Sequence, residues 1–220
     1  MFETHTNFTA RGSKQTDDGT LPTHHAWHET IEITHGFNEW FETGFYTFTS
    51  HQPGRGWMWV GTHLRPRVAI PERYHLPAGL SLSVECGYQR AKFSADTWTC
   101  EFRPIVDKKL GRWYAAFNPT FGRSFHGPES KRGFSFSPNF KASYDVTKRV
   151  AFGLEYYGAY GPLTGFDPLR DQQQEILPAL DLDLGEHWEF NLGVGLGMTQ
   201  ATDHLLVKMI VGYRFGRRGR

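Results

Sequence analysis

Residues 188–198, with the sequence WEFNLGVGLGM, decide the fold. Large apolar side chains occupy every second position of this stretch, and small or polar residues occupy the positions between them. A period of two predicts a β-strand, because successive side chains of a strand point to opposite faces of the sheet. The apolar face continues for about eleven residues, which suits a tilted strand that crosses a bilayer better than the short strands of soluble sheets.

The same alternation recurs along the whole chain. We expect strands at residues 1–10, 23–35, 39–51, 57–70, 79–92, 96–108, 112–125, 133–146, 150–161, 173–185, 187–200 and 203–216. The connections after the even-numbered segments are mostly short, whereas those after the odd-numbered segments include longer polar loops. Outer-membrane barrels show this asymmetry, with the short turns on the periplasmic side. The sequence therefore predicts an all-β fold, an antiparallel transmembrane β-barrel of about 12 strands, as a single domain over residues 1–220.

Composition excludes several other classes of protein. The 24 Lys and Arg against 23 Asp and Glu give a net charge of +1, so no nucleic-acid partner is expected. The mean hydropathy is −0.51 and no apolar run reaches the roughly 18 residues of a membrane-spanning helix. Aromatic residues make up 15% of the chain, which is too many for a disordered protein.

Aromatic residues lie beside the short turns and predict a girdle at the membrane interface. A single aromatic residue of this kind would more simply belong to the core of a soluble sandwich, and only the repetition favours the girdle. The residues concerned are Trp40, Phe41, Trp113, Tyr114, Phe152 and Trp188.

Three hairpins resemble the strand-turn-strand units of Gram-negative outer-membrane β-barrels. They are IEITHGFNEWFETGF, SYDVTKRVAFGLEYYG and LDLGEHWEFNLGVG, and the terminal VGYRF resembles the aromatic-ending last strand that the barrel assembly machinery recognises. Within that class the chain resembles most the transporter-like barrels grouped with the phenol-degradation meta-pathway outer-membrane proteins. The resemblance implies a passive channel for small solutes in the bacterial outer membrane, with outer-membrane lipid as its surroundings and the assembly machinery as its partner during biogenesis.

Two features depart from that class. The chain continues past Phe215 as GRRGR, and residues 1–12 carry no signal peptide, although an exported barrel requires one. We expect the signal peptide to lie upstream of Met1, removed in a mature form or lost to a start assigned too far downstream.

If the apolar faces meet lipid, the polar faces line the interior. His63, Arg65 and Arg67 then face the lumen between strands that bear Glu42 and Glu85, which predicts ion pairs between neighbouring strands. A structural network that stiffens the barrel is marginally the simpler interpretation, and a charged constriction that selects solutes is the other. The candidate lumen residues are Glu42, His63, Arg65, Arg67, Glu85, Glu101, Arg103, Lys141, Glu155, Asp181, Asp183, Glu189, Lys208 and Arg214, with Glu3, Glu32 and Asp107 on the same faces.

The sequence gives little indication of a metal site or of an enzyme active site. His24, His25 and His28 form HHAWH, and His5 and His204 come close to them if the barrel closes, but no carboxylate or cysteine stands at metal-ligand spacing. We therefore expect no metal and no cofactor. An embedded lipid hydrolase would need a nucleophile, a base and an orienting acid on one face.

Ser124 and His126 fit no hydrolase motif, so no enzymatic activity is expected.

Cys86 and Cys100 fall near opposite positions on the lipid face of adjacent strands, where a disulfide is conceivable and free thiols that act as small apolar residues are favoured. Two alternatives to a channel stay open. One is a structural or adhesive barrel that acts through the loops at 11–22 and 161–172, and the other is a soluble barrel with an apolar interior.

Overall fold

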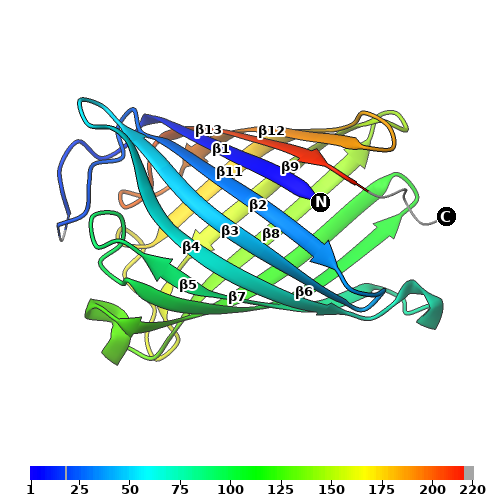
Figure 1. Ribbon diagram of the computed structural model, residues 1–220, viewed down its shortest axis with the longest axis horizontal. Coiled ribbons are helices and arrows are strands. Elements are labelled where there is room, and N and C mark those ends of the chain that lie inside the picture. Colours follow the sequence, from blue (N-terminus) through cyan, green and yellow to red (C-terminus); the bar gives the residue numbers. More distant parts are fainter. Residues whose placement is uncertain (18, 216–220) are drawn as a thin grey trace.

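The computed structural model describes residues 1–17 and 19–215 as one closed antiparallel sheet (Figure 1). Two short 3₁₀ helices, η1 (Glu72–Tyr74) and η2 (Pro128–Lys131), and a two-residue strand, β10 (Gly161–Pro162), lie in the connections. The twelve long strands are β1 (Phe2–Arg11), β2 (Trp27–Gly36), β3 (Phe41–Gln52), β4 (Gly56–Ala69), β5 (Gly79–Gln89), β6 (Trp98–Leu110), β7 (Trp113–His126), β8 (Phe134–Asp145), β9 (Val150–Ala159), β11 (Gln173–Asp183), β12 (Trp188–Gly197) and β13 (Leu205–Tyr213).

The sheet closes because its first and last strands pair. Phe2 of β1 lies opposite Tyr213 of β13, and each long strand pairs with the next one along the chain, including β8 with β9. Figure 1 shows the strands tilted relative to the barrel axis, as closure of a sheet into a barrel requires. The predicted all-β barrel of about 12 strands is confirmed. Residue 216, where the last predicted segment ends, and the GRRGR tail beyond Phe215 lie outside the described residues.

The burial pattern is the inverse of that of a soluble protein. Outward-facing apolar side chains are exposed along most of the long strands, and Trp113 reaches 61% exposure. The buried side chains are largely polar or charged, and Glu32 and Glu155 are each only 3% exposed. The apolar faces therefore point out and the polar faces point in, so the alternative of a soluble barrel with an apolar interior is wrong. No helix in the described part of the chain is long and apolar enough to cross a membrane.

The two ends of the barrel differ. At one end, where β1 begins and β13 finishes (right in Figure 1), the connections are short except for the one that contains η1. At the other end, which includes η2, they are longer except for 53–55. We call these the turn end and the loop end. The connections of the turn end are 37–40, 70–78, 111–112, 146–149 and 184–187, and those of the loop end are 12–26, 53–55, 90–97, 127–133, 160–172 and 198–204.

Aromatic side chains surround both ends on the outside. At the turn end Trp40, Trp113, Phe152 and Trp188 are exposed, as the predicted girdle requires. Tyr114 is a correction, because it follows the outward Trp113 and the alternation of β7 places it on the inner face. The sequence interpretation missed a second exposed aromatic set near the loop end, formed by Trp27, Trp57, Trp59, Trp98 and Phe125.

The two cysteines form a disulfide, contrary to the expectation of free thiols. Cys86 of β5 and Cys100 of β6 are direct cross-strand partners with their Cα atoms 4.1 Å apart. Such a close cross-strand position brings the two sulfur atoms within bonding distance. A disulfide of this kind forms and persists in an oxidising compartment such as the bacterial periplasm.

Candidate functional site

The lumen wall is a lattice of charged side chains. Thirteen of the fourteen candidate lumen residues lie on the strands and Arg214 directly follows β13. Each of them contacts a side chain of opposite or complementary charge type. They gather into two groups on different parts of the wall. One group lies on β2 to β6, and the other on β8 to β13.

Arg65 of β4 is the centre of the first group. Its Nη2 donates to Glu32 Oε1 at 2.7 Å, and its Nη1 lies 3.4 Å from Glu42 Oε1. Arg67 Nη1 donates to the same Glu42 oxygen at 3.2 Å. The bond to Glu32 passes over β3 at Gly44, where a Cβ would stand 3.0 Å from Glu32 Oε1 and 3.1 Å from Arg65 Nη2. A glycine at that position therefore leaves room for the ion pair.

The same group continues along β4, β5 and β6. His63 Nδ1 lies 2.8 Å from Glu85 Oε1, which confirms the predicted pairing of these strands. Glu85 and Glu101 are direct cross-strand partners, and like charges in such positions repel. Arg103 offsets this repulsion, because its Nη2 lies 2.7 Å from Glu101 Oε2 and 3.8 Å from Glu85 Oε2.

Glu155 of β9 is the centre of the second group. It pairs with Lys208 through Oε2 and with Lys141 through Oε1, the latter at 3.2 Å. Lys141 also lies 2.8 Å from Asp181, and Asn191 Nδ2 donates to that aspartate at 2.7 Å. Nearer the turn end, Arg214 pairs with Glu189 and lies 3.9 Å from Asp183 Oδ1.

Several polar residues of the wall were missed in the sequence. Tyr157 donates its hydroxyl to Glu155 Oε2 at 2.8 Å, and the ring of Tyr46 lies 5.6 Å from the guanidinium carbon of Arg65. Tyr46 shares the inward face of β3 with Glu42, and Tyr157 shares the inward face of β9 with Glu155. The alternation along each strand is therefore the signal that places both tyrosines on the lumen wall.

Three adjoining cavities run along β9, β11, β12, β13 and β1. Their volumes are about 410 Å³ near the turn end, about 560 Å³ in the middle and about 700 Å³ at the loop end. The first and second share Tyr157, Lys208 and Ile210 as lining residues, and the second and third share Glu175, Asp203 and Leu206. Because each cavity shares walls with the next, they form a string along the barrel axis, which we call the lumen path.

The lumen path carries more acidic than basic side chains. Among the described residues, its lysines and arginines are Lys141, Lys208 and Arg214, and none of these lines the loop-end cavity. An aqueous passage lined in this way attracts cations and repels anions. The acidic residues that line it are Glu3, Asp17, Glu155, Asp171, Glu175, Asp181, Asp183, Glu189 and Asp203.

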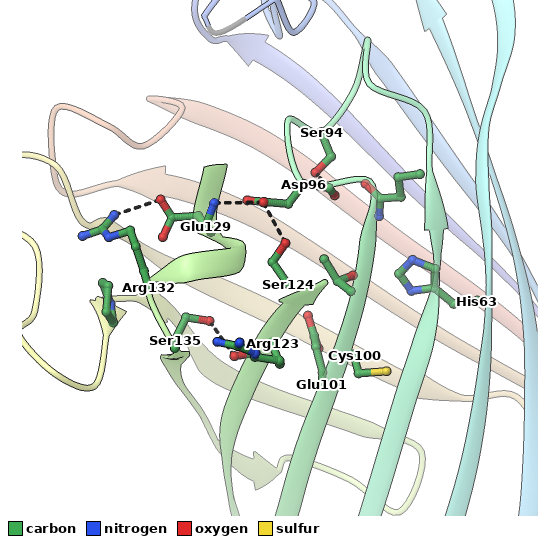
Figure 2. A pocket seen from close by; sticks show the side chains of 15 residues that line it. His63, Ser94, Asp96, Cys100, Glu101, Arg123, Ser124, Glu129, Arg132 and Ser135 are labelled. Atoms are coloured by element: carbon green, nitrogen blue, oxygen red, sulfur yellow. Dashed lines mark hydrogen bonds and ion pairs between the residues drawn. The ribbon is translucent and has the colours of Figure 1, made fainter. Parts of the chain in front are cut away.

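A separate cavity of about 280 Å³ lies between β6, β7 and η2 (Figure 2). Asp96 Oδ1 accepts hydrogen bonds from Ser124 Oγ at 2.7 Å and from the Glu129 amide at 3.1 Å, which ties η2 to the wall. Arg132 then donates to Glu129 at 2.9 Å and to Asp167 at 2.7 Å. The hydrogen bonds to Asp167 and Glu129 raise the pKa of the Arg132 guanidinium. The loop end is therefore braced by side chains on this part of the rim.

Ser124 and His126 fit no hydrolase motif in the sequence, and their side chains bind other groups in the structure. Ser124 Oγ is bonded to Asp96, and His126 Nδ1 lies 2.8 Å from Thr97 Oγ1. His24 and His25 stack with their ring centroids 4.0 Å apart in the loop before β2, while His28 faces the middle cavity. His5 joins Glu3 and Glu32 instead of these loop histidines.

Neither a protein-family model nor a curated protein sequence matches this chain. Solved structures do match. The NanC porin superposes with a TM-score of 0.67 at 7% identity, over 98% of this chain and all (100%) of that one. The chain has the fold of the bacterial outer-membrane porins.

Two further structures agree with this assignment of the porin fold. The KdgM porin, in complex with disordered oligogalacturonate, gives a TM-score of 0.62 at 10% identity over 98% of this chain and 99% of its own. An outer-membrane channel from Pseudomonas putida F1 gives a TM-score of 0.62 at 8% identity, over 97% of this chain and 95% of its own. These identities are low enough that the likeness concerns the fold.

Proposed function

We propose that this porin-like barrel is a passive channel for small solutes in the bacterial outer membrane. The observation that carries the proposal is the lumen path, the string of cavities that share lining residues from the turn end to the loop end. The exposed apolar belt faces lipid, and the barrel assembly machinery inserts the chain. A twelve-stranded barrel is intermediate between small barrels filled by side chains and wide open porins, so a narrow passage is its natural bore.

The charge of the lumen path favours cationic and neutral solutes over anions. Four acidic side chains line the loop-end cavity, and any solute that enters from that end meets them first. The phenol-degradation barrels that the chain resembles in sequence pattern would add aromatic compounds to the candidates. Among the porins with the same fold, KdgM is described in complex with disordered oligogalacturonate, which is an anion, so the acidic lumen path points to a different class of solute for this chain.

A channel accounts for the charged residues better than the alternatives do. The Ser124 hydroxyl donates to Asp96 and to the backbone oxygen of His126, and the His126 ring nitrogen lies beside Thr97, so no serine–imidazole pair favours a lipid hydrolase among the described residues. A loop-mediated binding protein would use the loop end, but it would leave the string of cavities without a role. The fourteen candidate lumen residues act in this proposal as the wall that sets the width and charge of the passage.

Conductance in planar bilayers tests the proposal. Purified barrel that migrates differently in gels before and after boiling is folded, and we expect it to conduct in discrete steps. Leu206→Trp should lower the conductance, because Leu206 lines the middle and loop-end cavities. Leu205→Trp is the matched control, because Leu205 pairs with the outward-facing Leu196 and shares its face. Folded protein that inserts without conducting would overturn the channel.

A further inference from the structure

We propose that Glu3, His5 and Glu32 form a binding site for a divalent transition-metal cation of the Zn²⁺ class on the lumen wall. One donor atom from each residue lies within 4.8 Å of the other two. His5 Nε2 is 3.5 Å from Glu32 Oε2 and 4.0 Å from Glu3 Oε1. Three ligands around a tetrahedral zinc ion with bonds of about 2.1 Å are about 3.4 Å apart, so small side-chain rotations close the site.

The histidine nitrogen at the centre of this cluster has no hydrogen-bond partner among the described residues. His5 Nε2 is buried and makes no hydrogen bond within the described chain, although it points between two carboxylates. A buried nitrogen left without a partner costs free energy, so such groups call for an explanation. A cation bound between the imidazole and the two carboxylates would give the nitrogen a partner and would offset the repulsion between the carboxylates.

The pairing of β1 with β2 sets up the cluster. Glu3 and Glu32 are direct cross-strand partners, and two carboxylates in such positions repel each other. Arg65 offsets the charge of Glu32 through Oε1 at 2.7 Å, which leaves the Oε2 atom of Glu32 free to face His5. Because His5 stands two residues after Glu3 on the same strand, it projects from the same face. The register of two strands therefore delivers all three donors.

The donor set selects the class of cation. One imidazole nitrogen with two carboxylate oxygens suits zinc and neighbouring divalent transition metals, whereas magnesium takes oxygen ligands and keeps its waters. Three protein ligands leave a fourth position open, as zinc sites that exchange ligands do. That position faces the passage, because Glu3 lines the turn-end cavity and His5 lines the middle cavity.

The location makes the site reachable for an ion in the lumen. The nearest protein cations leave the Oε2 atom of Glu32 to the ion, since Arg65 binds the Oε1 atom of Glu32 and Glu42, and Lys208 binds Glu155. An ion at the site would stand at the junction between the turn-end and middle cavities, where Tyr157 and Lys208 line both. Zinc bound there should therefore reduce the current that other ions carry.

Calorimetric titration of the folded, detergent-solubilised barrel with ZnCl₂ tests the site without relying on conductance. We expect one saturable site, at least tenfold weaker binding in His5→Gln and in Glu3→Gln, and no comparable binding of MgCl₂. His28→Gln is the matched control, because His28 lines the same middle cavity but forms no ion pair with a carboxylate among the described residues. The double variant His24→Gln, His25→Gln removes the exposed loop histidines and should bind zinc as the unmodified barrel does.

The outcomes separate this site from the channel. Zinc binding that survives in folded His5→Gln, or that disappears in the loop double variant, would overturn the site. Zinc binding that depends on His5 in a barrel that conducts nothing would keep the site and remove the channel. A difference in gel mobility before and after boiling shows that each variant is folded. If zinc blocks the current of the unmodified barrel but not that of the His5→Gln or Glu3→Gln variant, the metal site lies on the conducting path.

Discussion

Lys208→Gln is the sharpest test of how the lumen path selects ions. Lys208 lines both the turn-end and the middle cavity and is one of three basic residues of the path. Its ammonium pairs with Glu155, which keeps a second partner in Lys141 at 3.2 Å after the substitution. The variant therefore removes one positive charge from the passage without leaving Glu155 unpaired.

The expected magnitude follows from Coulomb's law. A unit charge about 6 Å from a passing ion in water contributes about 0.9 kcal/mol at a dielectric of 60 and about 0.7 kcal/mol at 80. Screening over a Debye length of about 10 Å at 0.1 M salt lowers this to about 0.4 kcal/mol. That energy changes the local concentration of each ion about twofold, up for cations and down for anions, so the cation-to-anion permeability ratio should rise about fourfold.

The assay is the reversal potential of single channels in a KCl gradient. Lys148→Gln is the control, because Lys148 lies in the short turn between β8 and β9 and does not line the lumen path. The control should leave the reversal potential unchanged. A conducting Lys208→Gln channel with the selectivity of the unmodified barrel, or with a shift toward anions, would refute the assignment of the path.

Three further substitutions test the wall. Cys86→Ser opens a disulfide to Cys100 with a sequence separation of 14 residues and should cost up to about 3 kcal/mol of unfolding free energy, seen as a lower urea midpoint. Glu32→Gln leaves a largely buried guanidinium short of one partner and should destabilise the barrel by up to about 3 kcal/mol in thermal unfolding. Asp96→Ala removes the acceptor that holds η2 and should speed trypsin cleavage within residues 127–133.

Each of these substitutions has a control on the same molecule. A reducing agent should lower the urea midpoint of the unmodified barrel and leave that of Cys86→Ser alone. Glu39→Gln breaks an ion pair with Arg73 whose side chains are 50% and 58% exposed, so it should change stability by less than about 1 kcal/mol. Asp171→Ala alters an exposed loop aspartate at the same end and should leave the cleavage rate unchanged. Equal effects in a test variant and its control would contradict the proposed contact.

The strands and their faces were predictable because the alternation of side chains between the two faces of a strand is visible in the local sequence. Once residues 188–198 establish which phase is apolar, each inward residue of a neighbouring strand follows from its own alternation. The alternation likewise places Glu42 and Arg67 on the same inner face, and the β3–β4 register then makes them direct partners. Tyr114 was assigned wrongly where proximity to a turn was preferred to parity.

Contacts that depend on reach or on exact register were not predictable. Arg65 pairs with Glu32 two strands away only because Gly44 on the intervening strand leaves space. The disulfide depends on the register of β5 and β6 across an eight-residue connection, 90–97, and a shift of one residue would place the two sulfurs on opposite faces. The cavities depend on where all the inward side chains end, which no local pattern contains.

The lumen is divided between two tasks, and this division explains how a twelve-stranded barrel can stay narrow without being blocked. On β2 to β6, Arg65 and its acidic partners are largely buried and fill the interior. On β9 to β13, the small residues Gly193 and Ala179 are cross-strand partners between the charged positions, and the string of cavities lies along these strands. A charged side chain held by partners on its own wall cannot swing across the passage, because every move would break an ion pair in a poorly solvated region. The charged residues of β2 to β6 therefore form a rigid wall, and the inward side chains of β9 to β13 determine how wide the path is.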